Sequence, residues 1–372
     1  MMFRAIGLKD RFRSVSVSVS VRADHMMTAA VLIKQNQPLS ILNNVLIPKP
    51  KKGQALVKIF FAGLCHSQLM EMDGKRGEDK YLPHLLGHEG VGKVVEIGEG
   101  VTKVQPDDEV ILGWIKGVGL EGGASQYQTS DGLMINSGSV TTFSEYAIVS
   151  ENRLTKKPTH TPSELAVLYG CAIPTGLGMV LNAVPENFTG TVGFLGLGGI
   201  GLSALLSAKL RGFEKVIAID INPEKLQLAM ELGATHVINP AHENTAHTVK
   251  NLTNKIGLDY CFESAGSIKT IELAFELTRR KGGRCIFASH PPIGEKVALD
   301  PFELICGKHI HGTWGGDSIP DQDIQKFDDL YKKGLLPLDK LINKKYALEN
   351  INQAIDDLKN KKIARALVEC LS

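Results

Sequence analysis

The stretch Gly196-Leu-Gly-Gly-Ile-Gly201 decides the fold of this chain. It directly follows a short apolar run at residues 191–195, typical of a buried strand, and opens a longer apolar run at residues 200–211, which has the length of a helix. In such a strand–turn–helix unit, glycines allow a tight turn, admit a pyrophosphate to the backbone and let helix and strand pack closely. Chance glycine clusters also produce this motif, so its context matters. The predicted dinucleotide-binding residues here are Gly196, Leu197, Gly198, Gly199, Ile200 and Gly201.

Asp220 ends the next predicted strand, at residues 215–220. A carboxylate about 20 residues beyond the glycines is placed to accept hydrogen bonds from the adenosine ribose. It would repel the 2′-phosphate of NADP, and no arginine immediately follows it, so the pattern favours NAD. A turn residue at the end of a strand is the alternative interpretation of Asp220. Lys225, in the following predicted helix, is equally well explained as a ribose contact or as a solvated lysine.

Strands and helices alternate around this motif. Strands are predicted at residues 191–195, 215–220, 235–238, 258–263, 283–288 and 309–314, and helices at residues 200–211, 223–232 and 268–279. Alternation of this kind indicates a parallel sheet with helices on both faces. The chain ends with a predicted helix at residues 348–358 and a strand at residues 364–370.

The preceding part of the chain has a different pattern. From residue 28 to about 158 the apolar runs are short, β-branched and separated by Gly and Pro, as at residues 55–62, 90–97, 109–112 and 143–149. This predicts a β-rich, barrel-like domain. Residues 117–138 are rich in glycine and weakly hydrophobic, so they are predicted to form a long loop.

Composition narrows the class of function. A length of 372 residues favours two domains, and a net charge of +2 argues against a nucleic-acid or anionic-membrane partner. We therefore expect a small-molecule substrate. The six cysteines are widely spaced, which indicates a reducing compartment, and the cytoplasm is the expected location. No stretch has the length and hydrophobicity of a membrane span.

The first 26 residues stand apart from the rest. They combine arginines, few acids and a repetitive Ser-Val tract, and the pair Met26-Met27 directly precedes the sequence that begins to look folded. We expect a leader that is disordered or extraneous, with a transit peptide as the alternative, and exclude residues 1–26 from the fold.

A metal site is only weakly indicated by spacing. Gly87-His88-Glu89 lies at a predicted strand, whereas Cys65 and Cys171 are far away in sequence. On spacing alone, His88 could be a hydrogen-bonded interior histidine and Cys171 a small buried hydrophobic residue.

Longer motifs favour a metal site. The run GHEGVGKVVEIGEGV at residues 87–101 resembles the zinc signature of the medium-chain alcohol dehydrogenase superfamily. The resemblance continues, in collinear order from residue 28 to the C-terminus, through GLCHS (63–67), TTFSEYAIV (141–149), CAIPTG (171–176), GLGGIG (196–201), AIDINPEK (218–225) and IARALV (363–368). It implies an α/β fold in which a Rossmann doubly wound parallel sheet, residues 173–315, is inserted into a GroES-like β-barrel catalytic domain, residues 27–172 and 316–372.

The resemblance also implies roles at the reacting centre. Cys65, His88 and Cys171 would be the protein ligands of a catalytic zinc, with water or substrate as the fourth ligand. Two thiolates and one imidazole form a zinc site of the open, catalytic kind. Glu89 would be a transient ligand or a group that tunes the field at the metal. Ser67 would accept the alcohol proton and pass it toward the cofactor ribose.

Further roles follow around the cofactor. Thr175 would pack near the nicotinamide, and Arg365 would contact the pyrophosphate, as His66 could also do. Trp114 aligns with a bulky position that narrows the substrate pocket, and a core aromatic is the alternative interpretation.

Three departures from the family pattern modify these expectations. Many relatives hold a second, structural zinc with four closely spaced cysteines, but residues 117–138 contain no cysteine. We therefore predict one catalytic zinc per subunit and no structural zinc. Gln68 stands where relatives often have an aspartate that supports the metal histidine. Met70 stands where some have the histidine that ends the proton relay, and His66 is an alternative final carrier.

The function expected from the sequence is zinc-dependent hydride transfer between an alcohol, or its aldehyde or ketone, and NAD(H). A zinc-free quinone or enoyl reductase of the same superfamily is one alternative, and a dinucleotide-binding protein without turnover is another. By resemblance, we expect a homodimer or homotetramer. The sequence does not predict which alcohol is the substrate.

Overall fold

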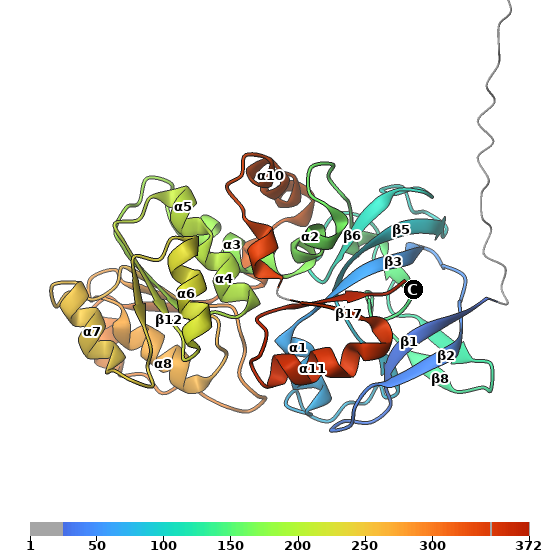
Figure 1. Cartoon of the computed structure of the whole chain (residues 1–372), viewed down its shortest axis with the longest axis horizontal. Coiled ribbons are helices and arrows are strands. Elements are labelled where there is room, and N and C mark those ends of the chain that lie inside the picture. Colours follow the sequence, from blue (N-terminus) through green and yellow to red (C-terminus); the bar gives the residue numbers. More distant parts are fainter. Residues whose placement is uncertain (1–24, 343, 372) are drawn as a thin grey trace, which may run out of the picture.

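The computed structural model describes residues 25–342 and 344–371, which form two lobes along a long axis (Figure 1). Residues 1–24, most of the expected leader, lie outside the described residues. Met26, predicted to belong to that leader, is instead the first residue of strand β1 (Met26–Leu32) and pairs with Leu46 of β2 (Ser40–Leu46).

One lobe contains the predicted parallel sheet. Its six described strands are β11 (Thr191–Leu195), β12 (Lys215–Ile219), β13 (His236–Ile238), β14 (Tyr260–Glu263), β15 (Arg284–Phe287) and β16 (His309–Gly312). They are all parallel and lie in the order β13-β12-β11-β14-β15-β16, which is the Rossmann order 3-2-1-4-5-6 and confirms that prediction. The order reverses between β11 and β14. Ligands of such folds bind in the crevice outside the strand ends at this point.

Helices join these strands. They are α4 (Gly199–Leu205), α5 (Ser207–Arg211), α6 (Pro223–Leu232), α7 (Thr245–Leu252), α8 (Ile268–Leu277) and α9 (Pro301–Ile305). The central strands are buried over most of their length, which fits a sheet covered on both faces. The single helix predicted at residues 200–211 is instead interrupted at Leu206, between α4 and α5.

The other lobe is built from two further sets of strands. Among the described residues a closed barrel contains β1, β2, β7 (Gln126–Thr129), β8 (Met134–Asn136) and β4 (His84–Leu85). A larger sheet has the order β10 (Leu154–Lys156), β6 (Glu109–Gly113), β5 (Glu89–Ile97), β3 (Gln54–Leu64), β18 (Ala366–Glu369) and β17 (Lys344–Ala347), with β9 (Tyr146–Ser150) also paired to β3. Because β18 pairs with β3, segments from both ends of the chain form one sheet (Figure 1).

The helices of this lobe are α1 (His66–Met72), α2 (Ser163–Ala166), α3 (Ala172–Ala183), α10 (Pro320–Lys332) and α11 (Ile351–Lys359). Helix α3 joins the two lobes, because a Cβ added at Gly176 would collide with the carbonyl of Ile200 in α4. One hydrophobic core continues across this junction, from Val91 and Ile111 to Phe194. The predicted domain boundaries fall at the start of α3 and in a 3-10 turn at Gly315–Asp317, and they remain predictions.

The predicted loop at residues 117–138 is only partly a loop, because it contains β7 and β8. The short strand β7 alternates exposed and buried side chains, and its buried Tyr127 hydroxyl accepts a hydrogen bond from the Ile148 N–H at 2.6 Å. Among the described helices, none alone is long and apolar enough to cross a membrane. Only the bent pair Ser163–Gly170 and Ala172–Ala183, with a 57° break, passes by length and composition.

Candidate active site

A single cleft of about 1620 Å³ is lined by residues from both lobes. Typical small-molecule sites enclose about 300–1,000 Å³. The cleft lies at the carboxyl ends of β11, β12 and β14, where the strand order predicts a ligand crevice. It therefore has room for a dinucleotide and a second small molecule together.

The fold brings together three residues that are distant in sequence. Cys65 lies between β3 and α1, His88 directly precedes β5, and Cys171 directly precedes α3. Their ligand atoms all lie within 4.8 Å of one another, and His88 Nε2 lies 3.3 Å from Cys171 Sγ. This donor set of two thiol sulfurs and one imidazole is the set that zinc prefers, and three protein ligands leave a fourth position open. The residues present thus fit a catalytic zinc ion.

The two sulfurs influence each other strongly. A hydrogen bond shared with Cys171 lowers the pKa of Cys65 well below its ordinary value. The same sharing, together with burial, raises the pKa of Cys171 well above the ordinary value. One thiolate is thus favoured in the isolated pair, and a divalent cation would stabilise the second negative charge.

Gly87 and Gly170 allow the ligand-bearing segments to approach closely. Gly87 has a φ of +91°, and an added Cβ there would collide with Thr142. At Gly170, an added Cβ would lie 2.8 Å from the Cβ of Glu89. Larger residues at either position would displace His88 or Cys171, because each glycine is the immediate chain neighbour of one of them.

Two side chains of α1 flank the second ring nitrogen of His88. The amide nitrogen of Gln68 lies 2.5 Å from His88 Nδ1, and the Ser67 hydroxyl lies 3.5 Å from it. Gln68 also accepts a hydrogen bond from the Cys65 N–H at 3.0 Å. Gln68 therefore contacts both Cys65 and His88, at the position where relatives often carry an aspartate. Ser67 and Met70 line the cleft.

Glu89 and Arg365 form a buried ion pair beside this triad. Burial raises the pKa of Glu89, although the guanidinium acts in the opposite direction. The side chain of Arg365 also lies against Gly199 of the glycine-rich turn, where an added Cβ would collide with its Nη1. Arg365 thus reaches from Glu89 to the turn predicted to hold the pyrophosphate. Glu89 Oε2 has no hydrogen-bond partner among the described residues.

The glycine-rich turn has the space that its motif predicts. Gly196 has a φ of +86°, and an added Cβ would lie 2.6 Å from the Ala265 nitrogen. At Gly201 an added Cβ would collide with the Gly196 carbonyl. Nothing lies within 4 Å of an added Cβ at Gly198, and Gly198 lines the cleft. The turn can therefore present its backbone to a ligand.

Asp220 has a structural role as well as a position in the cleft. Its Oδ2 accepts a hydrogen bond from the Leu197 N–H at 2.6 Å, and its Oδ1 accepts one from the Asn222 N–H at 2.9 Å. Both Asp220 and Lys225 line the cleft. The two interpretations of Asp220, turn residue and ribose contact, are thus compatible.

The remaining predicted residues also lie in the cleft. Thr175 is buried there, and its hydroxyl has no partner among the described residues. His66 lines the cleft, and the surrounding protein lowers its pKa by desolvation. Trp114 lines the cleft with its ring 6.5 Å from that of His88.

No sequence motif predicted a role for Trp314. It lies two residues beyond the end of β16, lines the cleft and contacts Trp114 edge to face, with the ring centroids 5.0 Å apart. Its position near the carboxyl end of a parallel strand was the available signal, because ligands of doubly wound sheets bind at these ends.

Carboxylate side chains form hydrogen bonds in and around residues 117–138, the segment where relatives often carry four cysteines. Glu151 accepts hydrogen bonds from the N–H groups of Thr102, Lys103 and Leu120 at 2.6–2.7 Å. Glu121 accepts hydrogen bonds from the hydroxyls of Ser139 and Ser150, at 2.9 and 3.0 Å. These bonds join the loop that follows Trp114 to the rest of the lobe.

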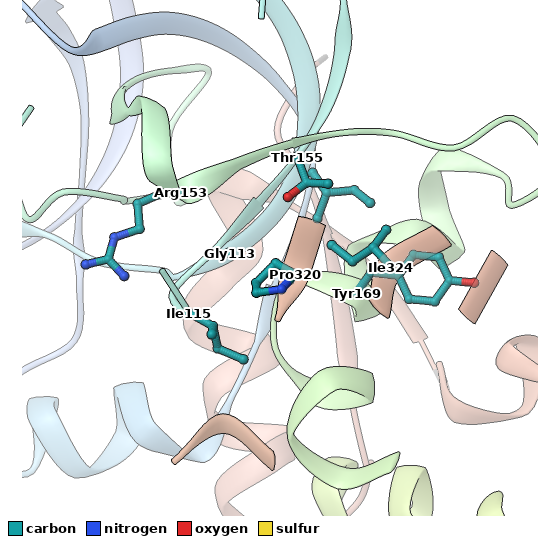
Figure 2. A pocket seen from close by; sticks show the side chains of 9 residues that line it. Gly113, Ile115, Arg153, Thr155, Tyr169, Pro320 and Ile324 are labelled. Atoms are coloured by element: carbon teal, nitrogen blue, oxygen red, sulfur yellow. The ribbon is translucent and has the colours of Figure 1, made fainter. Parts of the chain in front are cut away.

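A much smaller pocket, of about 10 Å³, lies next to the segment that carries Trp114 (Figure 2). This is about the room that one water molecule needs. Arg153 lies at one side of it, with its guanidinium turned away from Pro320 and Ile324. That guanidinium donates to the Trp114 carbonyl and so helps to fix this segment. None of the predicted site residues lines this pocket.

Comparisons with known proteins match both lobes. Residues 51–159 match the alcohol dehydrogenase GroES-like domain, and residues 199–333 match the zinc-binding dehydrogenase family. The chain is 32% identical over 359 residues to S-(hydroxymethyl)glutathione dehydrogenase of Paracoccus denitrificans, which covers 88% of this chain and 95% of that protein.

Solved structures of alcohol dehydrogenases are also similar to this chain. An alcohol dehydrogenase zinc-binding domain protein from Burkholderia ambifaria has a TM-score of 0.85 and 29% identity, over 94% of this chain and 100% of that one. Benzyl alcohol dehydrogenase from Acinetobacter calcoaceticus has a TM-score of 0.83 and 29% identity, over 93% of this chain and 100% of that one.

Proposed function

Because the chain belongs to the zinc-dependent medium-chain alcohol dehydrogenases, we propose that it uses NAD and one zinc ion held by Cys65, His88 and Cys171. As a member of this family it is a zinc-dependent alcohol oxidoreductase. The observation that carries the proposal is the convergence of two sulfurs and one imidazole, from three distant segments, beside the glycine-rich turn in one cleft.

Zinc in such a site acts as a Lewis acid and makes the hydroxyl of a substrate more acidic. The protein must then remove the proton and orient the carbon that gives up hydride. Ser67 supplies the hydroxyl of α1 that lines the cleft beside His88, so it accepts the substrate proton as it passes its own proton on toward the cofactor ribose. Thr175 and Trp114 are placed to confine the substrate and exclude water.

The choice of NAD rests on Asp220. Its carboxylate lies in the cleft beyond the glycine-rich turn and is fixed by two backbone N–H groups. A ribose diol can donate to this carboxylate, whereas the 2′-phosphate of NADP would be repelled by it. Arg365, against Gly199, supplies positive charge beside the turn where the pyrophosphate would bind.

We also propose that the subunit carries no structural zinc. Residues 117–138 contain no cysteine, and Glu121 and Glu151 make the hydrogen bonds that join this segment to its neighbours. Hydrogen bonds that carboxylates accept from backbone N–H groups and serine hydroxyls therefore supply the cross-links there.

A homodimer or homotetramer is proposed for the assembly. Strand β16 is an edge of the six-stranded sheet, with three of its four residues exposed. The exposed apolar side chains of Phe302 and Ile305 on α9 precede it. An exposed strand edge with apolar neighbours can pair with a second copy. None of the six cysteines, all of which lie in the described part of the chain, is in a disulfide bond, which supports the proposed cytoplasmic location.

The test is the initial rate of NADH formation from a panel of alcohols, with NAD or NADP, using protein purified without chelator. The proposal predicts turnover with NAD that is lost in His88→Ala. Reduction of quinones or enoyl substrates by a zinc-free protein would support the reductase alternative. Dinucleotide binding with no turnover of any alcohol would support the non-catalytic alternative.

A further inference from the structure

Both tryptophans of the chain lie in the active-site cleft. Trp114 follows β6 in the barrel-bearing lobe, and Trp314 follows β16 at the edge of the parallel sheet. Their ring centroids are 5.0 Å apart and their planes are inclined by 80°, which is an edge-to-face contact. The two rings therefore form a continuous aromatic surface from one lobe to the other.

This aromatic surface begins at a metal ligand. The Trp114 ring lies 6.5 Å from that of His88 and is inclined to it by 70°. Trp114 is only partly exposed, whereas Trp314 is 77% exposed, so Trp314 is the outer member of the pair. A substrate that has its hydroxyl oxygen at the triad and extends along these rings would contact Trp114 first and Trp314 next.

The inner tryptophan is held in place by its surroundings. Arg153 donates to the Trp114 carbonyl, and Gly315 lies beside the indole and Ile115. A Cβ added at Gly315, which has a φ of +62°, would lie 3.4 Å from Trp114 Cη2 and 2.7 Å from Ile115 Cδ1. The exposed face of Trp314, in contrast, is apolar surface that a bound molecule can cover.

We propose that Trp314, together with Trp114, makes the enzyme selective for alcohols with an aromatic ring on the carbinol carbon. An aromatic ring gains edge-to-face or offset contacts with the indoles in addition to apolar burial. A short alkanol has no ring with which to make these contacts, and a polyol finds no hydrogen-bond partner on an indole face. This inference rests on the proposed NAD-dependent function. The carbinol C–H bond breaks and its electron pair and hydrogen pass to NAD, while the hydroxyl proton is released, giving aryl aldehyde and NADH.

The experiment compares kcat/KM for benzyl alcohol and for ethanol, with NAD, in Trp314→Ala and Trp314→Phe. We expect Trp314→Ala to lower kcat/KM for benzyl alcohol by about tenfold and to lower that for ethanol far less, because ethanol has no aromatic ring to contact the indole. Trp314→Phe should retain most of the benzyl alcohol activity. Ile319→Ala, which removes another exposed apolar side chain from the same segment but outside the cleft lining, should leave the ratio unchanged.

Equal losses for both alcohols in Trp314→Ala would overturn the inference while leaving the proposed function intact. So would a parent enzyme that does not prefer benzyl alcohol to ethanol. If no alcohol is turned over, the proposed function fails, and binding then decides the inference separately. In Trp114→Phe the indole of Trp314 is the sole remaining one, and its fluorescence must change saturably with benzyl alcohol but not with ethanol. An unchanged emission would overturn the inference.

Discussion

Glu89 and Arg365, 276 residues apart in sequence, form a buried ion pair that links the proposed metal-ligand triad to the glycine-rich turn. Glu89 directly follows His88, and Arg365 lies against Gly199. The pair thus joins the beginning of β5 to the segment before β18. It couples the position of His88 to the place where the pyrophosphate is expected.

Replacing Arg365 by an uncharged residue should lower the stability of the folded protein. Arg365→Met leaves the buried Glu89 carboxylate without its counter-charge, and we expect the free energy of unfolding to fall by about 3 kcal/mol or more. The double variant Glu89→Gln/Arg365→Met should recover part of this loss, because the uncompensated charge is then gone. Urea unfolding of the parent and both variants measures these values. A single variant as stable as the parent would contradict this account of the pair.

Ser67 should affect the rate and leave the metal in place. Ser67→Ala removes the hydroxyl that accepts the substrate proton, and general acid–base groups of this kind contribute about 10²–10⁴-fold. We expect kcat for alcohol oxidation to fall by about 100-fold, with zinc content unchanged. Ser67→Thr keeps the hydroxyl and should retain most of the activity. If Ser67→Ala matches the parent in kcat, another group takes the proton.

Asp220 should determine the choice of dinucleotide. In Asp220→Asn one oxygen can still accept from the Leu197 N–H, but the charge is lost. Hydrogen bonds to charged groups contribute about 1.5–3 kcal/mol, so kcat/KM with NAD should fall by about tenfold or more. The value with NADP should fall less or rise, because repulsion of the 2′-phosphate is relieved. Glu224→Gln, an exposed acid on the following helix, is the matched control. A parent that prefers NADP would contradict the assignment.

The loop after Trp114 should be sensitive to acid. Partial burial acts to raise the pKa of Glu121, but hydrogen bonds from Lys116, Ser139, Ser150 and Asn152 lower it from 4.5 to about 2. A depressed folded-state pKa stabilises the fold above pH 4.5, and this stabilisation is lost as pH falls toward 2. Because Glu121 is more than a third exposed, its contribution is at most about 1 kcal/mol.

The matched comparison uses Glu121→Gln and Glu99→Gln. The first should be less stable than the parent at pH 7, and the difference should shrink as pH falls below 4.5. Glu99, on the surface with Lys52, should show little change at any pH. Urea unfolding at pH 7, 5 and 3.5 measures both. If the difference in unfolding free energy between Glu121→Gln and the parent grows as the pH falls, the predicted pH dependence is wrong.

Local patterns predicted much of the parallel sheet. The run at residues 191–195, the glycines after it and the proline-opened helix at residues 223–232 each have signals within a few residues, and the structure places β11, the turn and α6 there. The proposed metal ligands could not be predicted from a local pattern, because Cys65, His88 and Cys171 share no local spacing. Only the longer family motifs suggested that they meet, and the structure brings their ligand atoms together.

Other features depend on packing that no local pattern contains. Helix α3 includes one proline and two glycines, which are poor helix formers, but its nearly complete burial against α4 stabilises it. The ring contact between Trp114 and Trp314 joins two loops that follow strands of different sheets. The carboxylate bonds of Glu121 and Glu151 likewise join segments that are polar and weakly patterned in sequence.

Zinc content per subunit tests the central claim most directly. Elemental analysis of the parent, Cys65→Ser and Cys306→Ser would be made on protein purified without chelator. Cys306 is a free cysteine outside the cleft lining and serves as the control. We predict about one zinc in the parent and in Cys306→Ser, with loss of zinc in Cys65→Ser. A parent that contains no zinc would contradict the account, and two zinc ions per subunit would contradict the absence of a structural site.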